Sequence, residues 1–208
     1  MLERQRWRDA ANLELPAGVS KLQALSNHKW AVANVHFARA VGAARSGDVA
    51  RAHEEIAALA ALEQSLVVSP GEYDWRKQIS IERQIAEGWL AKAEHRNADA
   101  ERIMRAAADL DDATEKHPVT PGAILPAREE LGELLLDLSR STEALKEYQT
   151  SLTRAPRRLA GLYGAARAAH RAGNEKVARR YFAELIEMTK DGNSGLPEVK
   201  EAKAFVAR

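Results

Sequence analysis

The chain reads as a succession of helices, because its apolar runs are short and are broken by Arg, Glu or Asp throughout its 208 residues. Ala, Leu, Glu, Arg and Lys, which favour helices, dominate the composition. β-Branched residues, which favour strands, are sparse outside Leu66–Ser69, and Gly-Asp and Gly-Asn pairs mark turns. The pattern predicts an all-α protein without a sheet.

A small residue followed four positions later by an aromatic residue recurs at a fixed interval. Ala144 and Tyr148 form this pair, and Ala178 and Phe182 repeat it 34 residues further on. Two antiparallel helices approach closely only where small side chains lie at their crossing, and a large side chain then fills the space beside them. The spacing therefore predicts helix-turn-helix units that stack on one another.

The unit around Ala144 resembles the tetratricopeptide repeat, a helix-turn-helix repeat of about 34 residues. The residues that carry the resemblance are Leu131, Gly132, Ala144, Tyr148 and Pro156. The resemblance implies a right-handed α-solenoid that holds a peptide or protein partner in a concave groove. Gly132 and Ala144 are expected at the helix crossing, with Tyr148 filling the space beside them.

Other parts of the chain follow the same pattern with longer connections. The equivalent alanines, separated by 48, 44 and 34 residues, are Ala52, Ala100, Ala144 and Ala178. Turns are predicted at Gly47-Asp48, at His95–Asn97 and at Gly173. One domain over residues 1–208 is expected, with units at about 33–66, 81–114, 125–158 and 159–192.

Flanking helices are expected at both ends, over about residues 2–14 and 197–207. The first resembles the second helix of a pair that lacks its first helix, which suggests the hypothesis that the chain begins within a larger array. The last opens with Pro197, a helix-start signal, and its apolar face is expected to cover the final hydrophobic surface of the array.

A proline-rich stretch over residues 115–129 interrupts the helical pattern. Pro118, Pro121 and Pro126 restrict the residues before them to extended conformations and end the preceding helix. The stretch is interpreted first as a connection between repeats. Because loops on a rigid scaffold often carry recognition, it is also a candidate binding element, with His117 as its candidate residue.

In this repeat class the first helix of each pair lines the groove. The resulting surface is aromatic in the first half, acidic in the middle and basic toward the end. The candidates for contact with a partner are Asn34, Phe37, Arg45, Glu82, Trp89, Lys92, Glu129, Glu133, Asp137, Tyr163, Arg167, His170 and Arg171. An extended or helical peptide is expected to bind there through an aromatic anchor and charge pairing. Lys and Asn do not recur at fixed groove positions, so an acidic C-terminal motif is not the expected ligand.

Alternatively, the charged candidates neutralise one another inside the protein. Glu133 and Arg167 occupy equivalent positions on neighbouring first helices and are placed to pair. Asp109–Thr150 contains ten acidic and four basic residues, whereas Ser151–Arg208 contains twelve basic and six acidic residues. Such an asymmetry either steers a charged partner or lets neighbouring helices attract one another.

Composition limits the classes of function. A net charge of +1 argues against a dedicated nucleic-acid-binding protein. No apolar stretch approaches the roughly 20 residues needed to span a bilayer, the N-terminus lacks the apolar core of a secretory signal, and the chain has no cysteine. We expect a cytoplasmic protein that binds neither nucleic acid nor membrane, with self-association through terminal repeats left open.

Few residues suggest chemistry. Glu129 and Glu133 are one helical turn apart and share a face, as an acid/base or metal pair would. His117 has acidic neighbours in sequence, and His36 and His53 lie on the two helices of one pair, but none has a recognised metal-ligand spacing. We expect no enzyme, no catalytic or metal-binding residue and no cofactor.

Two further groups have structural and functional interpretations. Four tryptophans lie in the first half and are expected to pack in the core or between repeats: Trp7, Trp30, Trp75 and Trp89. Five arginines near and beyond Pro156 are placed to form a basic ridge: Arg154, Arg157, Arg158, Arg179 and Arg180. No aromatic residues interleave them, as single-strand nucleic-acid binding would favour.

Together these observations favour a non-enzymatic scaffold for protein–protein interaction. The alternative is an accessory or regulatory segment of a larger protein that binds a small molecule or a metal near the 115–129 loop. Because this repeat class serves many unrelated processes, the sequence does not identify the partner.

Overall fold

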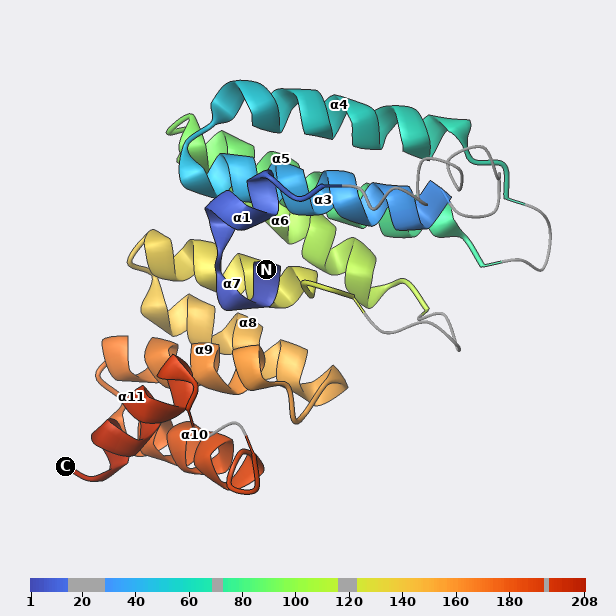
Figure 1. The fold of residues 1–208 in the computed structure, drawn as a ribbon. Helices are drawn as coiled ribbons and strands as arrows, with labels where there is room; N and C mark the ends of the chain where they lie inside the picture. Colours follow the sequence, from blue (N-terminus) through green and yellow to red (C-terminus); the bar gives the residue numbers. More distant parts are fainter. Residues whose placement is uncertain (15–28, 69–72, 116–122, 193–194) are drawn as a thin grey trace. The chain divides into compact units, whose positions relative to one another are not determined.

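The computed structural model describes residues 1–14, 29–68, 73–115, 123–192 and 195–208 (Figure 1). Within these ranges every regular element is a helix and no strand is present, so the prediction of an all-α fold is confirmed. The chain divides into two compact units, Met1–Ala127 and Arg128–Arg208. The expected single domain and the right hand of the array stay predictions.

In the unit Met1–Ala127, two long helix pairs pack against each other (Figure 1). The helices are α3 (Lys29–Ser46) with α4 (Val49–Ser65), and α5 (Trp75–Ala93) with α6 (Asn97–Asp112). Within each pair the helices are antiparallel because only a short turn joins them, and α5 packs against both α3 and α4. The N-terminal residues form a 3-10 helix, η1 (Leu2–Arg4), and α1 (Trp7–Ala11), which packs on α3.

The N-terminal segment is two short helices where one helix over about residues 2–14 was expected. Gln5 has a φ of 51°, which is left-handed backbone, and its amide donates to the Leu2 carbonyl at 2.8 Å. This geometry ends η1 and redirects the chain, so α1 starts anew at Trp7.

In the unit Arg128–Arg208, consecutive helices pack on one another (Figure 1). The helices are α7 (Ala127–Asp137), α8 (Ser141–Arg154), α9 (Leu159–Arg171), α10 (Glu175–Met188) and α11 (Pro197–Val206). α11 begins at a proline. Proline suits this position because it lacks an amide hydrogen, and the amides of the first turn have no hydrogen-bond partner within the helix. Val199 and Ala202 of α11 are buried, and the helix packs against α10.

One turn geometry joins the helices of all four pairs. A residue with left-handed backbone follows each first helix: Gly47 (φ 88°), His95 (62°), Ser139 (61°) and Gly173 (75°). The next amide then donates to the carbonyl five residues earlier, for example from Asp48 to Ala43 at 2.9 Å and from Arg140 to Leu135 at 2.8 Å. This pattern satisfies carbonyls that a helix end leaves unbonded, and it reverses the chain within a few residues.

Small residues form the crossing of each pair. The small buried residues at equivalent positions are Ala40, Gly88, Gly132 and Ala166 on the first helices, and Ala52, Ala100, Ala144 and Ala178 on the second helices. A β-carbon at Gly132 would lie 2.8 Å from Cε2 of Tyr148, and one at Gly88 would lie 2.9 Å from Cε of Met104. Tyr148 therefore fills the space beside Gly132, and Met104 does the same beside Gly88.

Candidate partner-binding surface

The first helices of the unit Met1–Ala127, α3 and α5, carry six of the predicted partner-binding residues. Asn34, Phe37 and Arg45 follow one face of α3, and Glu82 and Trp89 follow one face of α5, because steps of three, seven or eight residues keep side chains on one side of a helix. Lys92 lies one turn beyond Trp89 and donates to Asn97 at 3.2 Å.

Three of these six side chains are buried and belong to the core. Phe37 and Trp89 are each 1% exposed, and Glu82 is 5% exposed. The helices α3 and α5 pack against each other, which places large side chains of both helices in the interior. Asn34, Arg45 and Lys92 are partly exposed and stay candidates for contact with a partner.

Glu82 is a buried carboxyl with incomplete hydrogen bonding. Its Oε1 accepts a long bond from Gln78 at 3.4 Å, and among the described residues its Oε2 has no hydrogen-bond partner. Burial raises the pKa of this carboxyl to about 8, because the charged form loses its solvation, while the Gln78 bond lowers it. The neutral form of Glu82 therefore predominates at pH 7. Its buried neighbours Ile81 and Ile85 were the sequence signal for an interior position.

Arg45 lies between two tryptophans. Its guanidinium carbon is 5.0 Å from the centre of the Trp7 ring and 4.0 Å from that of Trp89. Contacts of this kind are attractive because a cation faces the negative surface of an aromatic ring. Arg45 thus ties the N-terminal helix α1 to α5, which sequence reasoning did not predict.

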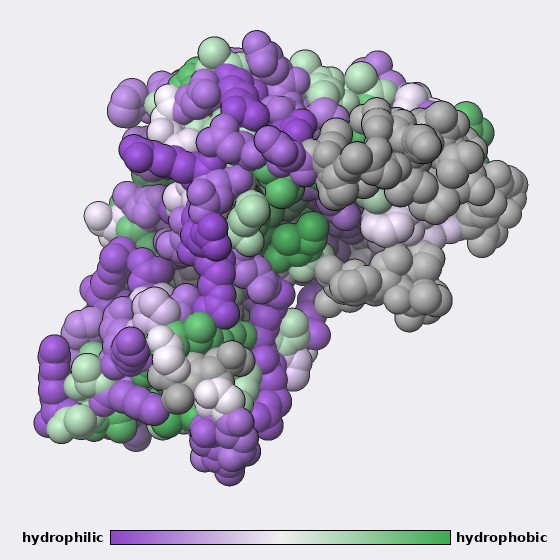
Figure 2. Space-filling view, viewed as in Figure 1, coloured by the Kyte–Doolittle hydropathy of each residue, from purple (hydrophilic) through white to green (hydrophobic). Residues whose placement is uncertain are grey.

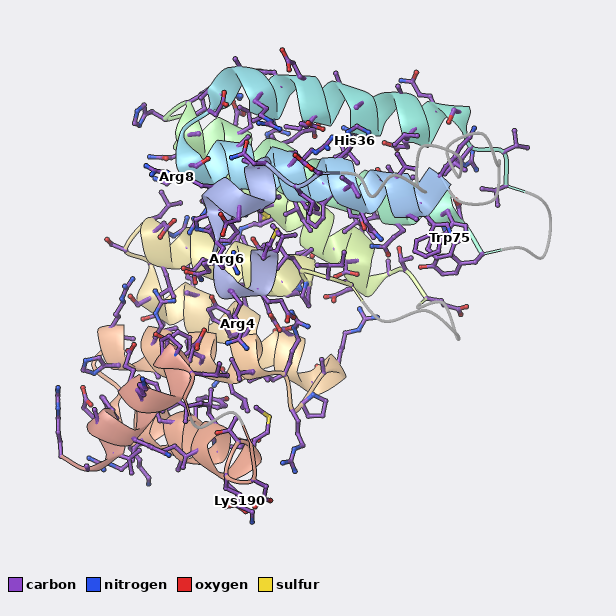
Figure 3. All side chains as sticks on the ribbon, viewed as in Figure 1. Arg4, Arg6, Arg8, His36, Trp75 and Lys190 are labelled. Atoms are coloured by element: carbon purple, nitrogen blue, oxygen red, sulfur yellow. The ribbon has the colours of Figure 1, made fainter. Side chains whose placement is uncertain are left out.

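A second aromatic cluster lies at the start of α3 and α5. Trp30 and Trp75 are stacked with centroids 4.8 Å apart, and Tyr73 meets Trp75 edge to face at 4.8 Å; Figure 3 labels Trp75. Burial first, and then the carboxylates of Asp111 and Asp74, raise the pKa of Tyr73. The stack agrees with the expected role of the tryptophans in packing.

Two histidines singled out in the sequence are each bonded to a glutamate. His36 Nδ1, labelled in Figure 3, lies 2.6 Å from Glu55 Oε2 on α4, and His53 Nε2 lies 2.8 Å from Glu94 Oε1 beyond α5. The first contact joins α3 to α4, and the second joins α4 to the residue that follows α5. The two histidines are not brought together.

In the unit Arg128–Arg208, Glu133 of α7 is the centre of a polar cluster. The Tyr148 hydroxyl donates to Glu133 Oε2 at 3.0 Å, and Arg167 Nη1 donates to the same oxygen at 3.2 Å. Burial and the nearby Glu133 carboxylate hold the pKa of Tyr148 well above its usual value. The pairing of Glu133 with Arg167, one of the two alternatives from the sequence, is therefore observed.

Glu129, the other glutamate of the predicted pair, is buried and also neutralised. Arg158 Nε lies 2.9 and 3.0 Å from its two oxygens, and the Ser151 hydroxyl donates to Oε1 at 3.4 Å. Glu129 and Glu133 are thus each held by an arginine from the region of α9. These two pairs explain part of the charge asymmetry by internal attraction.

Tyr163 and His170 of α9 contact the last helix, α11. The Tyr163 hydroxyl donates to Glu201 at 2.5 Å, and the His170 ring meets the Phe205 ring edge to face at 5.0 Å. Burial and the Glu201 carboxylate raise the pKa of Tyr163. His170 also lies 2.7 Å from Glu175 through Nδ1, yet it remains exposed. Asp137 and Arg171, at the ends of α7 and α9, are exposed.

The arginines of the predicted basic ridge are partly used within the protein. Arg158 is bound to Glu129, Arg179 donates to the Val206 carbonyl at 2.7 Å, and the Arg180 guanidinium lies 4.6 Å from the centre of the Tyr181 ring. These contacts engage charges that nucleic-acid binding would require.

His117, the loop candidate, lies outside the described residues. In the part of the chain that the structure describes, no three His, Asp or Glu side chains converge as the ligands of a metal ion would. None of the helices described is both long and apolar enough to cross a bilayer.

The turns and crossings described above define a protein of tetratricopeptide-like helix pairs, in which six of the thirteen predicted partner-binding side chains lie in the core or in buried ion pairs. No protein-family model matches the sequence, and no curated protein matches it. A solved structure that the chain resembles is PcrH from Pseudomonas aeruginosa, with a TM-score of 0.48 and 16% identity over 61% of this chain and 89% of that chain. A likeness of this size carries no conclusion about function.

Proposed function

We propose that the protein is a non-enzymatic scaffold that binds a protein or peptide partner along the first helices of its helix pairs. The observation that carries the proposal is the row of exposed side chains at the ends of α7 and α9, namely Asp137, His170 and Arg171. Below this row, Glu133 and Arg167 are fixed by mutual hydrogen bonds. Recognition groups on a rigid base lose little conformational entropy on binding.

The partner that suits this surface is a peptide segment that carries both charges. Asp137 at the end of α7 is acidic, whereas His170 and Arg171 at the end of α9 provide hydrogen-bond donors. Exposed charges of this kind contribute mainly to specificity and to the rate of association. Tyr163 of the same helix α9 is half-buried and donates to Glu201 of α11, and it is the aromatic candidate for an anchor.

Two observations support a role without catalysis. The paired glutamates that resembled an acid/base or metal site, Glu129 and Glu133, are each occupied by an arginine. Three of the five arginines of the basic region, Arg158, Arg179 and Arg180, are engaged in contacts within the protein, which supports a partner other than nucleic acid. We place this function in the cytoplasm, in keeping with a chain that has no cysteine.

The test is affinity capture from the native cell extract with two variants of the full chain. Asp137→Lys with Arg171→Glu reverses both charges on the first helices at constant net charge. Lys146→Glu with Glu184→Lys does the same at exposed positions on the second helices, α8 and α10. We expect the first variant to lose the proteins that the wild type captures and the second to retain them. Equal capture by both variants would contradict the proposal.

A further inference from the structure

The contact between the N-terminal segment, residues 1–14, and α3 differs from the rest of the unit Met1–Ala127. A β-carbon at Gly42 would lie 2.6 Å from the Trp7 carbonyl oxygen and 2.9 Å from the Ala10 carbonyl carbon. The backbone of α1 therefore rests directly on the backbone of α3, and only glycine permits this approach. At the other crossings of this unit, side chains such as Met104 fill the space.

Three arginines complete this contact. Arg45 stacks between Trp7 and Trp89, Arg39 Nε donates to the Leu13 carbonyl at 2.7 Å, and Arg51 Nη1 donates to Asn12 Oδ1 at 2.9 Å. Arg39 and Arg51 thus donate hydrogen bonds to the two residues that follow Ala11, the last residue of α1. The last carbonyls of a helix carry partial negative charge, so the surface is complementary to a helix C-terminus. We call these residues, Arg39, Gly42, Arg45, Arg51 and Trp89, the Gly42 surface.

The composition of the contact is that of an interface between proteins. Tryptophan and arginine are enriched where partners dock, whereas most of the buried hydrophobic residues of this unit are Ala, Ile, Leu and Val. With five residues, α1 is too short to be a stable helix by itself, so the Gly42 surface holds it in shape. The outward side of the segment is hydrophilic, and Figure 3 labels its exposed Arg4, Arg6 and Arg8; Figure 2 shows the same face mostly in purple.

We propose that the Gly42 surface is a docking site for the last turn of a partner helix, and that residues 1–14 are its built-in competitor. The proposal deepens the scaffold function and rests on it. The segment defines the chemistry of the partner: a tryptophan that stacks on Arg45, small residues three and four positions later against Gly42, and a following carbonyl that accepts from Arg39. Partner and segment compete for the same groups.

The segment is tethered, which sets the strength of this competition. The segment belongs to the same chain as the Gly42 surface, so the competition is intramolecular and does not depend on protein concentration. A free helix therefore binds only if it exceeds this competition or if the internal segment is weakened.

The experiment uses full-length variants and a synthetic peptide with the sequence of residues 1–14, amidated at its C-terminus and labelled. Trp7→Ala weakens the internal segment, because it removes the ring that stacks on Arg45. We expect the peptide to bind the Trp7→Ala chain at least tenfold more tightly than the wild type, measured by fluorescence anisotropy. Arg8→Ala, at an exposed position of α1, is the matched control and should behave as the wild type.

A second change locates the binding. Gly42→Val in the Trp7→Ala chain blocks the backbone approach and should abolish peptide binding, while circular dichroism confirms that the helices remain. If that chain does not fold, the substitutions Arg39→Gln and Arg51→Gln are made in the Trp7→Ala chain instead. They should weaken the binding of the peptide at least tenfold. Undiminished binding to these variants, or equal binding to the wild type and the Trp7→Ala chain, would overturn the proposal.

Self-association of the Trp7→Ala chain without peptide binding would also overturn it, in favour of a second copy as the occupant. The charge reversal at Asp137 and Arg171 lies in the other unit and should leave peptide binding unchanged. The docking site and the proposed function can therefore fail separately.

Discussion

The ring of Tyr148 occupies the space that a side chain on Gly164 would need. A β-carbon at Gly164 would lie 2.8 Å from Cδ1 of that ring and still closer to Cε1 and Cζ. On its other side the ring meets Gly132 in the same way. Tyr148 of α8 is thus enclosed by the backbones of α7 and α9, the first helices of two successive pairs.

Gly164→Ala is expected to destabilise the protein by roughly 2–3 kcal/mol, because the methyl group would displace the enclosed ring. The loss should appear although alanine favours a helix over glycine by about 1 kcal/mol. Urea unfolding followed by circular dichroism measures the difference. Gly192→Ala is the control, since a β-carbon there has no neighbour within 4 Å. Equal stability of the two variants would contradict the steric argument.

The left-handed turns predict stabilising substitutions. Ser139 and His95 have the same backbone as Gly47 and Gly173 in the equivalent turns, and a side chain raises the energy of that conformation. Ser139→Gly and His95→Gly should each raise the free energy of unfolding by about 0.5–1 kcal/mol, as measured by thermal unfolding. Gly47→Ala should lower it by a similar amount, about 1 kcal/mol. A loss of stability in both glycine variants would show that these turns carry no strain.

Arg167→Met tests the buried ion pair of the unit Arg128–Arg208. The substitution leaves Glu133, whose side chain is 13% exposed, with the Tyr148 hydroxyl but without its cation. We expect a loss of roughly 2–4 kcal/mol in chemical unfolding. Arg171→Met, on the exposed end of the same helix, should change stability by less than about 0.5 kcal/mol. If the double variant Glu133→Gln with Arg167→Met is as unstable as Arg167→Met alone, the uncompensated charge is not the cause.

Glu82 predicts a decrease in stability as the pH rises. Its pKa is 4.5 in model compounds and about 8 in the folded protein, so between these values the native state holds a proton that the unfolded chain has lost. Stability falls with pH wherever the native state binds more protons, so the contribution is complete below the lower pKa and is lost by the upper one.

Glu82→Gln removes this titration and keeps a side chain of the same size. Its stability relative to the wild type should therefore increase between about pH 5 and pH 8, in urea unfolding at several pH values. Glu54→Gln, at an exposed position on α4, should keep the pH dependence of the wild type. Parallel pH profiles of the wild type and Glu82→Gln would contradict the assignment.

Side-chain size made the helix pairs predictable from sequence. Ala144 and Tyr148, with Gly132 upstream, show where two helices approach, since the residue types themselves set the distance. The contact of Tyr148 with Gly164 was missed because it depends on how one pair lies on the next. Likewise, the left-handed backbone of His95 and Ser139 was missed because neither residue is glycine.

The surface was harder to predict than the helices. Phe37 and Trp89 occupy positions that face a groove in the repeat pattern, but here they are buried where α3 and α5 pack. The period of a helix shows which residues share a face and does not show what covers that face. The ion pair of Glu129 with Arg158 spans 29 residues, and its arginine precedes α9 rather than lying on it.

All four tryptophans belong to the unit Met1–Ala127, and the stack of Trp30 on Trp75 joins the beginnings of two of its helices. Indole fluorescence therefore reports on this unit alone, while far-ultraviolet ellipticity reports on both. Unfolding curves recorded with the two signals would coincide if the chain melts in one cooperative step and would separate if the units melt independently.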